Sequence, residues 1–298
     1  MKRHWPAAVF CLALAISLAS CTKAPGTHTP AAASSAPAPE AVSAPPLAVL
    51  GAFQQEVMLL KDLLADARAR EIEGIEFISG RIGAEPVVLA WTGVGKVNAA
   101  MTTTLLLEHF QPRQVIFTGI AGGVDPNLEP GDIVIARQTA YHDMGTLWPQ
   151  GLEYGGVKSR MTNEPNPVFF AADPMLLAVA QQAAHSVAFG AIDLRNGQRP
   201  PQVVVGTVVT GDVFVAAEKK AAELVETLGA RAVEMEGAAV AQVCYQREVG
   251  CLVIRSISDK ADNSAVMDKQ LFYTRAAQNS ARLVVEMVRE LTKGPNAK

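Results

Sequence analysis

Short hydrophobic runs alternate with longer amphipathic stretches along residues 47–298. Such runs are typical of buried strands, and the amphipathic stretches are typical of helices that pack on them. Strands are predicted at 47–51, 75–81, 86–91, 114–119, 132–136, 203–210 and 251–257, and helices near 56–68, 97–109, 174–186, 216–228, 237–248 and 268–292. The alternation predicts an α/β fold: a single three-layer domain with a central, mostly parallel (mixed) sheet flanked by helices.

The N-terminal segment does not follow this pattern. Lys2 and Arg3 precede a short apolar stretch, which predicts a secretory signal peptide over residues 1–20 rather than a membrane-spanning helix. Residues 18–21 (LASC) resemble a bacterial lipoprotein box, so we expect Cys21 to carry the lipid. The protein would then be a membrane-anchored lipoprotein of the bacterial cell envelope that faces the periplasm. A plain signal peptide, an uncleaved anchor, or a cytoplasmic protein that does not use the signal are the alternatives.

A linker is predicted between the signal peptide and the domain. Residues 22–46 contain 14 Ala or Pro residues among 25. This composition has no apolar face to bury, so a disordered, semi-extended tether is expected. Together with Cys21 it forms the segment 21–46, and the catalytic domain is predicted over 47–298.

Composition and charge exclude several classes of protein. The chain has 298 residues, and its net charge of −3 gives no basic stripe for binding nucleic acid. Cys244 and Cys251 lie in the domain without a CxxC pair, and they form either a disulfide or two buried thiols. No cluster of His, Cys and Asp has the spacing of metal ligands, so neither a metal nor a cofactor is expected.

Polar residues gather where the predicted strands end. Gly, hydroxyl or carboxylate groups follow five strands, in segments 52–56, 92–96, 118–123, 210–214 and 258–259. Ligands of open α/β sheets bind beyond the carboxyl ends of the strands, so the pocket is expected at this edge.

Two of these segments are rich in glycine. TGVGKV (92–97) is not a P-loop, and GIAGGV (119–124) lacks the GxGxxG spacing. Each loop therefore either offers backbone N–H groups to a polar ligand or forms a tight turn that needs glycine.

Three carboxylates stand out at these strand ends. Glu236 in VEMEGAAVAQVC is expected on the apolar face of a helix, with Glu234 roughly 200° away around the axis. A carboxylate on a buried face is costly unless it has a partner. Asp259 ends an apolar strand, and Glu56 lies at the first strand-to-helix turn. Helix capping explains each acid alone, whereas three acids at three strand ends favour a catalytic site.

Seven segments make the domain recognisable. They are LGAFQQEVMLL (50–60), TGVGKVNAA (92–100), LLLEHFQPRQVIFTGIAGGVDPNLEPGDIVIA (105–136), YHD (141–143), TGDVFV (210–215), AVEMEGAAVAQVC (232–244) and VIRSISDKAD (253–262). In this order and spacing the domain resembles the 5′-methylthioadenosine/S-adenosylhomocysteine nucleosidases of the purine nucleoside phosphorylase superfamily. The resemblance covers nearly all of 47–298 and implies a nucleoside phosphorylase-like fold.

The resemblance also implies the reaction. It would be hydrolysis of the N-glycosidic bond of adenine nucleosides, with 5′-methylthioadenosine, S-adenosylhomocysteine and 5′-deoxyadenosine as candidates. The products would be adenine and the 5-substituted ribose. The resemblance further implies a homodimer in which a neighbour's loop completes the pocket for the 5′-substituent. The stretch 144–169 departs from the family next to that pocket, so the 5′-substituent stays open.

Nine residues receive roles from the resemblance. Asp259 would protonate N7 of the purine, Glu236 would bind the ribose hydroxyls and stabilise the oxocarbenium-like transition state, and Glu56 would deprotonate the attacking water. Asp259 should therefore be poorly solvated. The implied substrate-binding residues are Phe214 and Val215 at the purine, Met235 beneath the ribose, Thr92 near the ribose and water, and Ser258 with Arg255, which would support the turn that carries Asp259.

Phosphorolysis is the main alternative. Phosphorylases of this superfamily hold phosphate with arginines, whereas loop 51–56 carries Glu56 and loop 92–96 has Lys96 but no Arg. A carboxylate would repel phosphate by about 1–4 kcal/mol at about 4 Å, which favours water as the nucleophile. A non-catalytic nucleoside-binding protein on the same fold and a hydrolase of a futalosine-like nucleoside are further alternatives.

Overall fold

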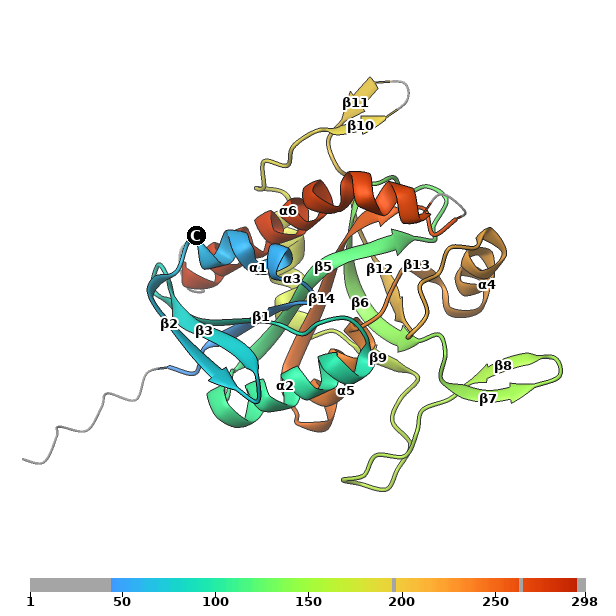
Figure 1. Ribbon diagram of the computed structural model, residues 1–298, viewed down its shortest axis with the longest axis horizontal. Coiled ribbons are helices and arrows are strands. Elements are labelled where there is room, and N and C mark those ends of the chain that lie inside the picture. The colour runs from blue at the N-terminus through green and yellow to red at the C-terminus, as the bar shows by residue number, and fades with distance from the viewer. Residues whose placement is uncertain (1–43, 195–196, 263–264, 294–298) are drawn as a thin grey trace, which may run out of the picture. The chain divides into compact units, whose positions relative to one another are not determined.

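The computed structural model describes residues 44–194, 197–262 and 265–293 (Figure 1). The predicted signal peptide over 1–20, the predicted lipid site Cys21 and the linker up to residue 43 lie outside the described residues. Among the described helices, none is both long and apolar enough to cross a membrane.

A 10-stranded mixed sheet forms the centre of the domain. Its order is β13 (Ala230–Glu234), β12 (Val203–Thr210), β6 (Ile133–Tyr141), β14 (Gly250–Asp259), β5 (Gln114–Gly123), β1 (Leu47–Gly51), β4 (Glu85–Trp91), β3 (Ile75–Ile82) and β2 (Ala65–Ile72), with β9 (Phe169–Ala171) beside β6. Parallel pairs join β1 to β4 and β5, β14 to β5, and β12 to β6 and β13. The mixed sheet is confirmed, although antiparallel pairs along β2–β3–β4 and between β6 and β14 make it less parallel than predicted.

One strand closes part of the sheet into a ring. Strand β13 pairs with β12 and also, in antiparallel fashion, with the end of β5, where Val233 lies opposite Gly122. On the other side of β5, Asp259 of β14 lies opposite the same Gly122. The carboxyl ends of β5, β13 and β14 therefore meet at one place, which Figure 1 shows to the right of the β5 label.

Helices cover both faces of this sheet. Helices α1 (Gln54–Lys61), α3 (Pro174–Ala184) and α6 (Ala265–Thr292) pack on one face, and α2 (Lys96–Phe110) and α5 (Gly237–Gln246) pack on the other (Figure 1). Within β1, Leu47 and Val49 face the first group, whereas Ala48 and Leu50 face the second. This alternation is the period of two expected of a strand buried on both sides. The predicted three-layer architecture is confirmed.

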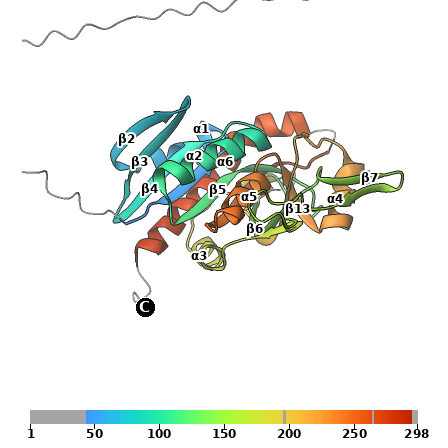
Figure 2. The same ribbon diagram turned by 90° about the horizontal axis from the view of Figure 1, so that it is seen from below.

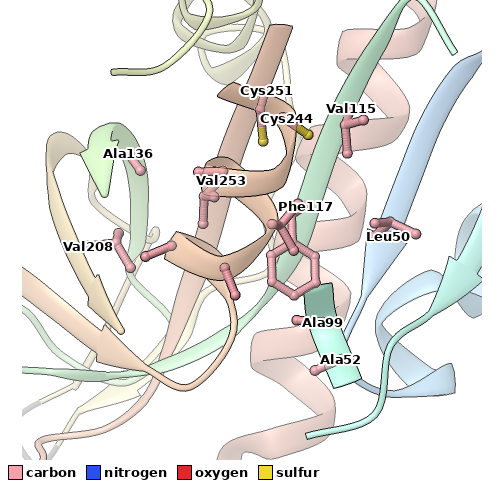
Figure 3. Close-up of a cluster of buried hydrophobic side chains, with 14 of the residues drawn as sticks. Leu50, Ala52, Ala99, Val115, Phe117, Ala136, Val208, Cys244, Cys251 and Val253 are labelled. Atoms are coloured by element: carbon pink, nitrogen blue, oxygen red, sulfur yellow. The ribbon is translucent and has the colours of Figure 1, made fainter. Parts of the chain in front are cut away.

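The two domain cysteines lie in the core between the sheet and helices α2 and α5. Figure 3 shows Cys244 and Cys251 in the cluster that also holds Phe117 and Ala99. Both are free thiols and both are buried. Of the two alternatives, buried thiols are therefore the one observed.

One predicted helix is too long, and one strand was missed. The helix expected over 56–68 ends at Lys61, and the following residues enter the edge strand β2, whose side chains are almost all exposed. The short strand β13 was not predicted at all. An exposed edge strand has no apolar face, and β13 (ARAVE) is interrupted by Arg231 and Glu234, so it lacks the apolar run that marks the buried strands.

The long stretch after β6 contains more structure than its composition suggested. Strands β7 (Gly145–Trp148) and β8 (Gly151–Tyr154) form a hairpin that stands away from the body in Figures 1 and 2. A second hairpin joins β10 (Ile192–Leu194) to β11 (Gly197–Arg199). The remaining helix, α4 (Glu218–Leu228), packs against β12 and β13.

Candidate active site

A cavity lies where the strand ends meet. About 520 Å³ of space there is not filled by protein atoms, a volume that includes space open to solvent. Residues at or just beyond the carboxyl ends of β1, β4, β5, β12 and β14 contribute to its wall, as the positions of the polar residues predicted. Residues 233–236 add a sixth side, which contains the predicted Met235 and Glu236 but begins in β13, a strand that was not predicted.

Most of the residues singled out from the sequence meet in this cavity. Those that line it are Glu56, Phe214, Val215, Met235, Glu236, Ser258 and Asp259. Thr92 and Arg255 do not line it. The hydroxyl of Thr92 donates to the carbonyl of Gly93 at 2.7 Å, so its bond is made within its own turn.

Glu56 is buried at the junction of β1, α1 and β5. Its Oε2 accepts from the backbone N–H groups of Ala52 (2.6 Å) and Phe53 (3.0 Å), and its Oε1 accepts from Ile120 N–H at 3.1 Å. Glu56 therefore does cap the start of α1, as the helix-capping alternative expected, but it also binds to β5. Burial raises the pKa of Glu56, while the charge of Arg255 and these hydrogen bonds oppose the rise.

Glu234 corrects the helical projection made from the sequence. The chain is a strand up to Glu234, and α5 begins only at Gly237, so the two glutamates are not related by helical geometry. The carboxylate of Glu234 accepts from the N–H groups of Glu236 (3.0 Å) and Gly237 (2.7 Å), which have no partner within the helix. Thr210 completes the cap, since it accepts from Ala238 N–H at 2.8 Å and donates to Glu234.

This cap leaves the side chain of Glu236 available to the cavity. Glu236 occupies the N-cap position of α5, but its side chain does not cap the helix. Its Oε1 instead accepts from the N–H of Gly95 at 2.9 Å. Burial and, next, the charge of Glu234 raise the pKa of Glu236, and Arg255 and the Gly95 N–H partly offset this rise. The capping alternative therefore does not apply to Glu236.

Arg255 lies fully buried behind the cavity wall. Its Nη2 donates to Glu234 and lies 3.9 Å from Oε2 of Glu236, and its guanidinium stacks 4.2 Å from the ring centre of Phe117. The described contacts are thus with acids and an aromatic ring, not with the turn at Asp259. This corrects the role expected for Arg255: it places a positive charge among the carboxylates.

The glycines of the two Gly-rich loops act in different ways. Gly95 has a φ of +96°, so the first loop contains a turn that needs glycine and also supplies an N–H group to the site. Gly119 lies inside β5 without such a φ, but a Cβ there would collide with Nη1 of Arg255 and lie 2.7 Å from Oε1 of Glu56. The second loop therefore needs glycine for close approach.

Asp259 is almost completely buried at the end of β14, so the expectation of poor solvation is confirmed. The hydroxyl of Ser258 donates to Oδ2 at 2.7 Å, and the N–H of Ala261 donates to Oδ1 at 2.9 Å. A Cβ at Gly122 would lie 2.9 Å from Oδ1, which explains the small residue opposite. Helix α6 begins six residues later, at Ala265.

Comparison with known proteins identifies the family. The model of the phosphorylase superfamily matches residues 46–289. The 5′-methylthioadenosine/S-adenosylhomocysteine nucleosidase of Bacillus thuringiensis (strain Al Hakam) is 37% identical over 246 residues, which are 82% of this chain and 99% of the relative. The chain belongs to the 5′-methylthioadenosine/S-adenosylhomocysteine nucleosidase family. The resemblance seen in the seven sequence segments is confirmed.

Solved structures agree with this nucleosidase family. The crystal structure of the nucleosidase from Neisseria meningitidis in complex with methylthio-immucillin-A has a TM-score of 0.72 at 35% identity, and the match covers 83% of this chain and 100% of that one. The futalosine hydrolase of Helicobacter pylori strain 26695 has a TM-score of 0.69 at 30% identity, with 82% and 97% covered. Both confirm the nucleoside phosphorylase-like fold.

The ion pair beneath the nucleosidase cavity yields the first prediction. Replacing Glu234→Gln should lower the free energy of unfolding by about 3–5 kcal/mol, because it leaves the charge of Arg255 buried without its bonded partner. Urea unfolding followed by circular dichroism measures the change. The control is Glu286→Gln, which breaks the pair with the exposed Arg289 and should cost less than about 1 kcal/mol. Equal losses of stability in the two variants would show that the buried ion pair contributes no more to the free energy of unfolding than the exposed one.

Proposed function

We propose that this protein hydrolyses the N-glycosidic bond of 5′-substituted adenine nucleosides and releases adenine and the 5-substituted ribose. The observation that carries the proposal is that the buried acids Glu56, Glu236 and Asp259, with Glu234 beside them, line one cavity together with Phe214. Its candidate substrates are 5′-methylthioadenosine and S-adenosylhomocysteine, the compounds named in the relatives.

Departure of adenine requires a proton on the purine. Asp259 is the proposed acid, because a buried carboxyl group is easier to keep protonated than an exposed one. The hydroxyl of Ser258 and the N–H of Ala261 hold its two oxygens in place. Phe214, which is 40% exposed in the cavity wall, offers a flat apolar face for stacking the purine, and Val215 follows it.

The ribose becomes positively charged as the bond breaks. Glu236 is the proposed stabiliser, because its carboxylate is fixed by the Gly95 N–H before reaction and needs no reorganisation. Arg255, at 3.9 Å, favours the ionised form of this carboxylate. Met235 precedes Glu236 in the cavity wall and is proposed to pack beneath the sugar.

Glu56 is the proposed base for the attacking water. Its raised pKa suits a group that must accept a proton near neutral pH. A base and an acid on opposite sides of the sugar follow the logic of inverting glycosidases, transferred to an N-glycoside.

Charge in the cavity supports water rather than phosphate as the nucleophile. Among the described residues that line it, every charged side chain is a carboxylate. The cation that loop 92–96 could offer to phosphate, Lys96, lies 2.7 Å from Asp143 and 3.7 Å from Asp212. The charge of Lys96 is therefore already neutralised by the two aspartates. A non-catalytic binding protein would not need three buried acids around one cavity.

Adenine release tests the reaction and its acid. The wild type should release adenine at the same rate in phosphate-free and phosphate buffer. Replacing Asp259→Asn should lower kcat by about 10²–10⁴-fold, because the leaving group loses its proton donor. The exposed Asp66→Asn is the control and should keep full activity.

Two results would contradict the proposal. A rate that depends on phosphate would indicate phosphorolysis, and full activity of Asp259→Asn would remove the assigned acid. The assay should follow adenine from 5′-methylthioadenosine, S-adenosylhomocysteine and 5′-deoxyadenosine, and hypoxanthine from futalosine, because a futalosine hydrolase shares the fold.

We also propose a homodimer that forms through α2 and α5. Val97 (78% exposed) and Met101 (47%) lie on α2, and Tyr245 (54%) lies on α5, which packs in the same layer. Apolar side chains gathered on one face often mark an interface. The hairpin β7–β8 adds Leu147 and Trp148, both exposed, as candidates to reach a neighbour's 5′ pocket.

Light scattering after gel filtration tests the dimer. The wild type should have the mass of two chains, and Val97→Glu should shift it toward one chain, since the new charge would be buried in the interface. Leu63→Glu, at an exposed apolar position outside both helices, should leave the mass unchanged. A monomeric wild type would exclude the proposed interface.

We further propose that the protein is a lipoprotein held at the bacterial membrane through Cys21. The family match begins at residue 46, so the LASC motif and the Ala/Pro-rich segment lie outside it. Replacing Cys21→Ser should move the protein from the membrane fraction to the soluble fraction, because the lipid attachment is lost. Unchanged membrane association of the variant would exclude lipid anchoring at this residue.

A further inference from the structure

Lys96 joins two loops of the cavity at a point that the reaction itself does not use. It is the first residue of α2 and directly follows Gly95, whose N–H donates to Glu236. Its Nζ donates to both carboxylate oxygens of Asp143, at 2.8 and 2.7 Å, just beyond the end of β6. The side chains of Lys96 and Asp143 are only about one-fifth exposed, so this pair is less screened than an ordinary surface pair.

Asp212 binds to the same lysine from a third strand end. Its Oδ1 accepts from the backbone N–H of Lys96 at 2.8 Å, and its own N–H donates to Oδ2 of Asp143 at 2.9 Å. Helix α2 has no acidic residue in its first turn and no side-chain cap from Gly95. Asp212 therefore supplies, from another part of the chain, the negative charge that stabilises the start of this helix.

These bonds connect the two halves of the proposed substrate site. Asp212 immediately precedes residues 213–215, which form the purine side of the cavity. Lys96 immediately follows Gly95, which holds the carboxylate on the ribose side. A shift of the purine loop would therefore move the Lys96 backbone, and with it the N–H group that positions Glu236.

We propose that Lys96, Asp143 and Asp212 form a positioning cluster that couples the purine loop 213–215 to the Gly95 hydrogen bond on Glu236. None of the three residues lines the described cavity. They act through Gly95 and through the loop, so that a purine bound against Phe214 favours the arrangement in which Glu236 is fixed for the ribose. Coupling of this kind is reciprocal, so loosening the cluster weakens the binding of adenine as well as the reaction.

The cluster should also influence the pH profile. Three charged groups surround Glu236: Glu234 of β13, Arg255 of β14 and Glu56 of α1. Its hydrogen-bond donor is the N–H of Gly95. That N–H favours the ionised carboxylate, so losing it raises the pKa of Glu236. Since the reaction needs the anion, activity would then be lost at a higher pH as the solution is made acidic.

Lys96→Met tests the coupling, which rests on the proposed function. We expect kcat/KM to fall about tenfold and its acid limb to move up by about one pH unit, the effect of one lost hydrogen bond to a charged group. The dissociation constant of adenine, measured by calorimetry, should rise as well. Lys96→Arg, which keeps the charge, should restore most of each property.

The matched control is Arg247→Met, which removes an ion pair from the opposite end of the same helix. Arg247 donates to Glu108 of α2 at 2.5 Å, in an exposed position far along the helix from Gly95. This variant should keep the activity, the acid limb and the affinity for adenine. If both variants lose activity equally, or if Lys96→Met loses it with an unchanged acid limb and unchanged adenine binding, the coupling is wrong.

A second pair of variants covers the case in which Lys96→Met does not fold. Asp212→Asn keeps an acceptor for the Lys96 N–H, whereas Asp212→Ala removes it, so only the alanine variant should show the full loss and the shifted acid limb. Equal behaviour of the two would overturn the proposal. A wild type that releases no adenine from any of the nucleosides would contradict the proposed function, whereas the adenine titrations would still test the link between Lys96 and the purine loop.

Discussion

The buried ion pair between Glu234 and Arg255 is the interaction on which the cavity depends. Glu234 satisfies the N–H groups at the start of α5, and Arg255 neutralises it in a place from which water is excluded. Two buried charges are costly to desolvate, so the pair is stable only because additional hydrogen bonds saturate the carboxylate. The bond from Thr210, which also accepts from Ala238, provides part of that saturation.

The pair has a chemical consequence for the acids around it. Without a cation nearby, burial and the mutual repulsion of Glu234 and Glu236 would favour the neutral form of at least one of them. Burial raises the pKa of both Glu236 and Glu56, and the charge of Arg255, 3.9 Å from Glu236, opposes this rise and so favours the anionic forms that the proposed mechanism requires. The same residue thus stabilises the fold and sets the charge state of the site. Gly119 makes this possible, because a side chain there would occupy the space of Arg255 and Glu56.

The fold and most of the site could be predicted because both follow local rules. Apolar runs in β1, β4, β5, β12 and β14 mark buried strands, and ligands bind at their carboxyl ends. Two features were beyond those rules. Strand β13 (ARAVE) has no apolar run, and its second pairing with β5 is a long-range contact that no local pattern encodes. The position of Glu234 and the partner of Arg255 both depend on that pairing, so both were misjudged from the sequence.

The charge distribution explains how a fold shared with phosphorylases can favour water. A phosphate nucleophile needs uncompensated cations beside the sugar. Here Lys96 is bound to Asp143, and Arg255 is bound to Glu234, so neither presents a free positive charge to the cavity. The acids that line the cavity give it a negative potential. This potential attracts the sugar as it becomes cationic, and it repels phosphate. Selectivity for the nucleophile and stabilisation of the transition state therefore have one electrostatic origin.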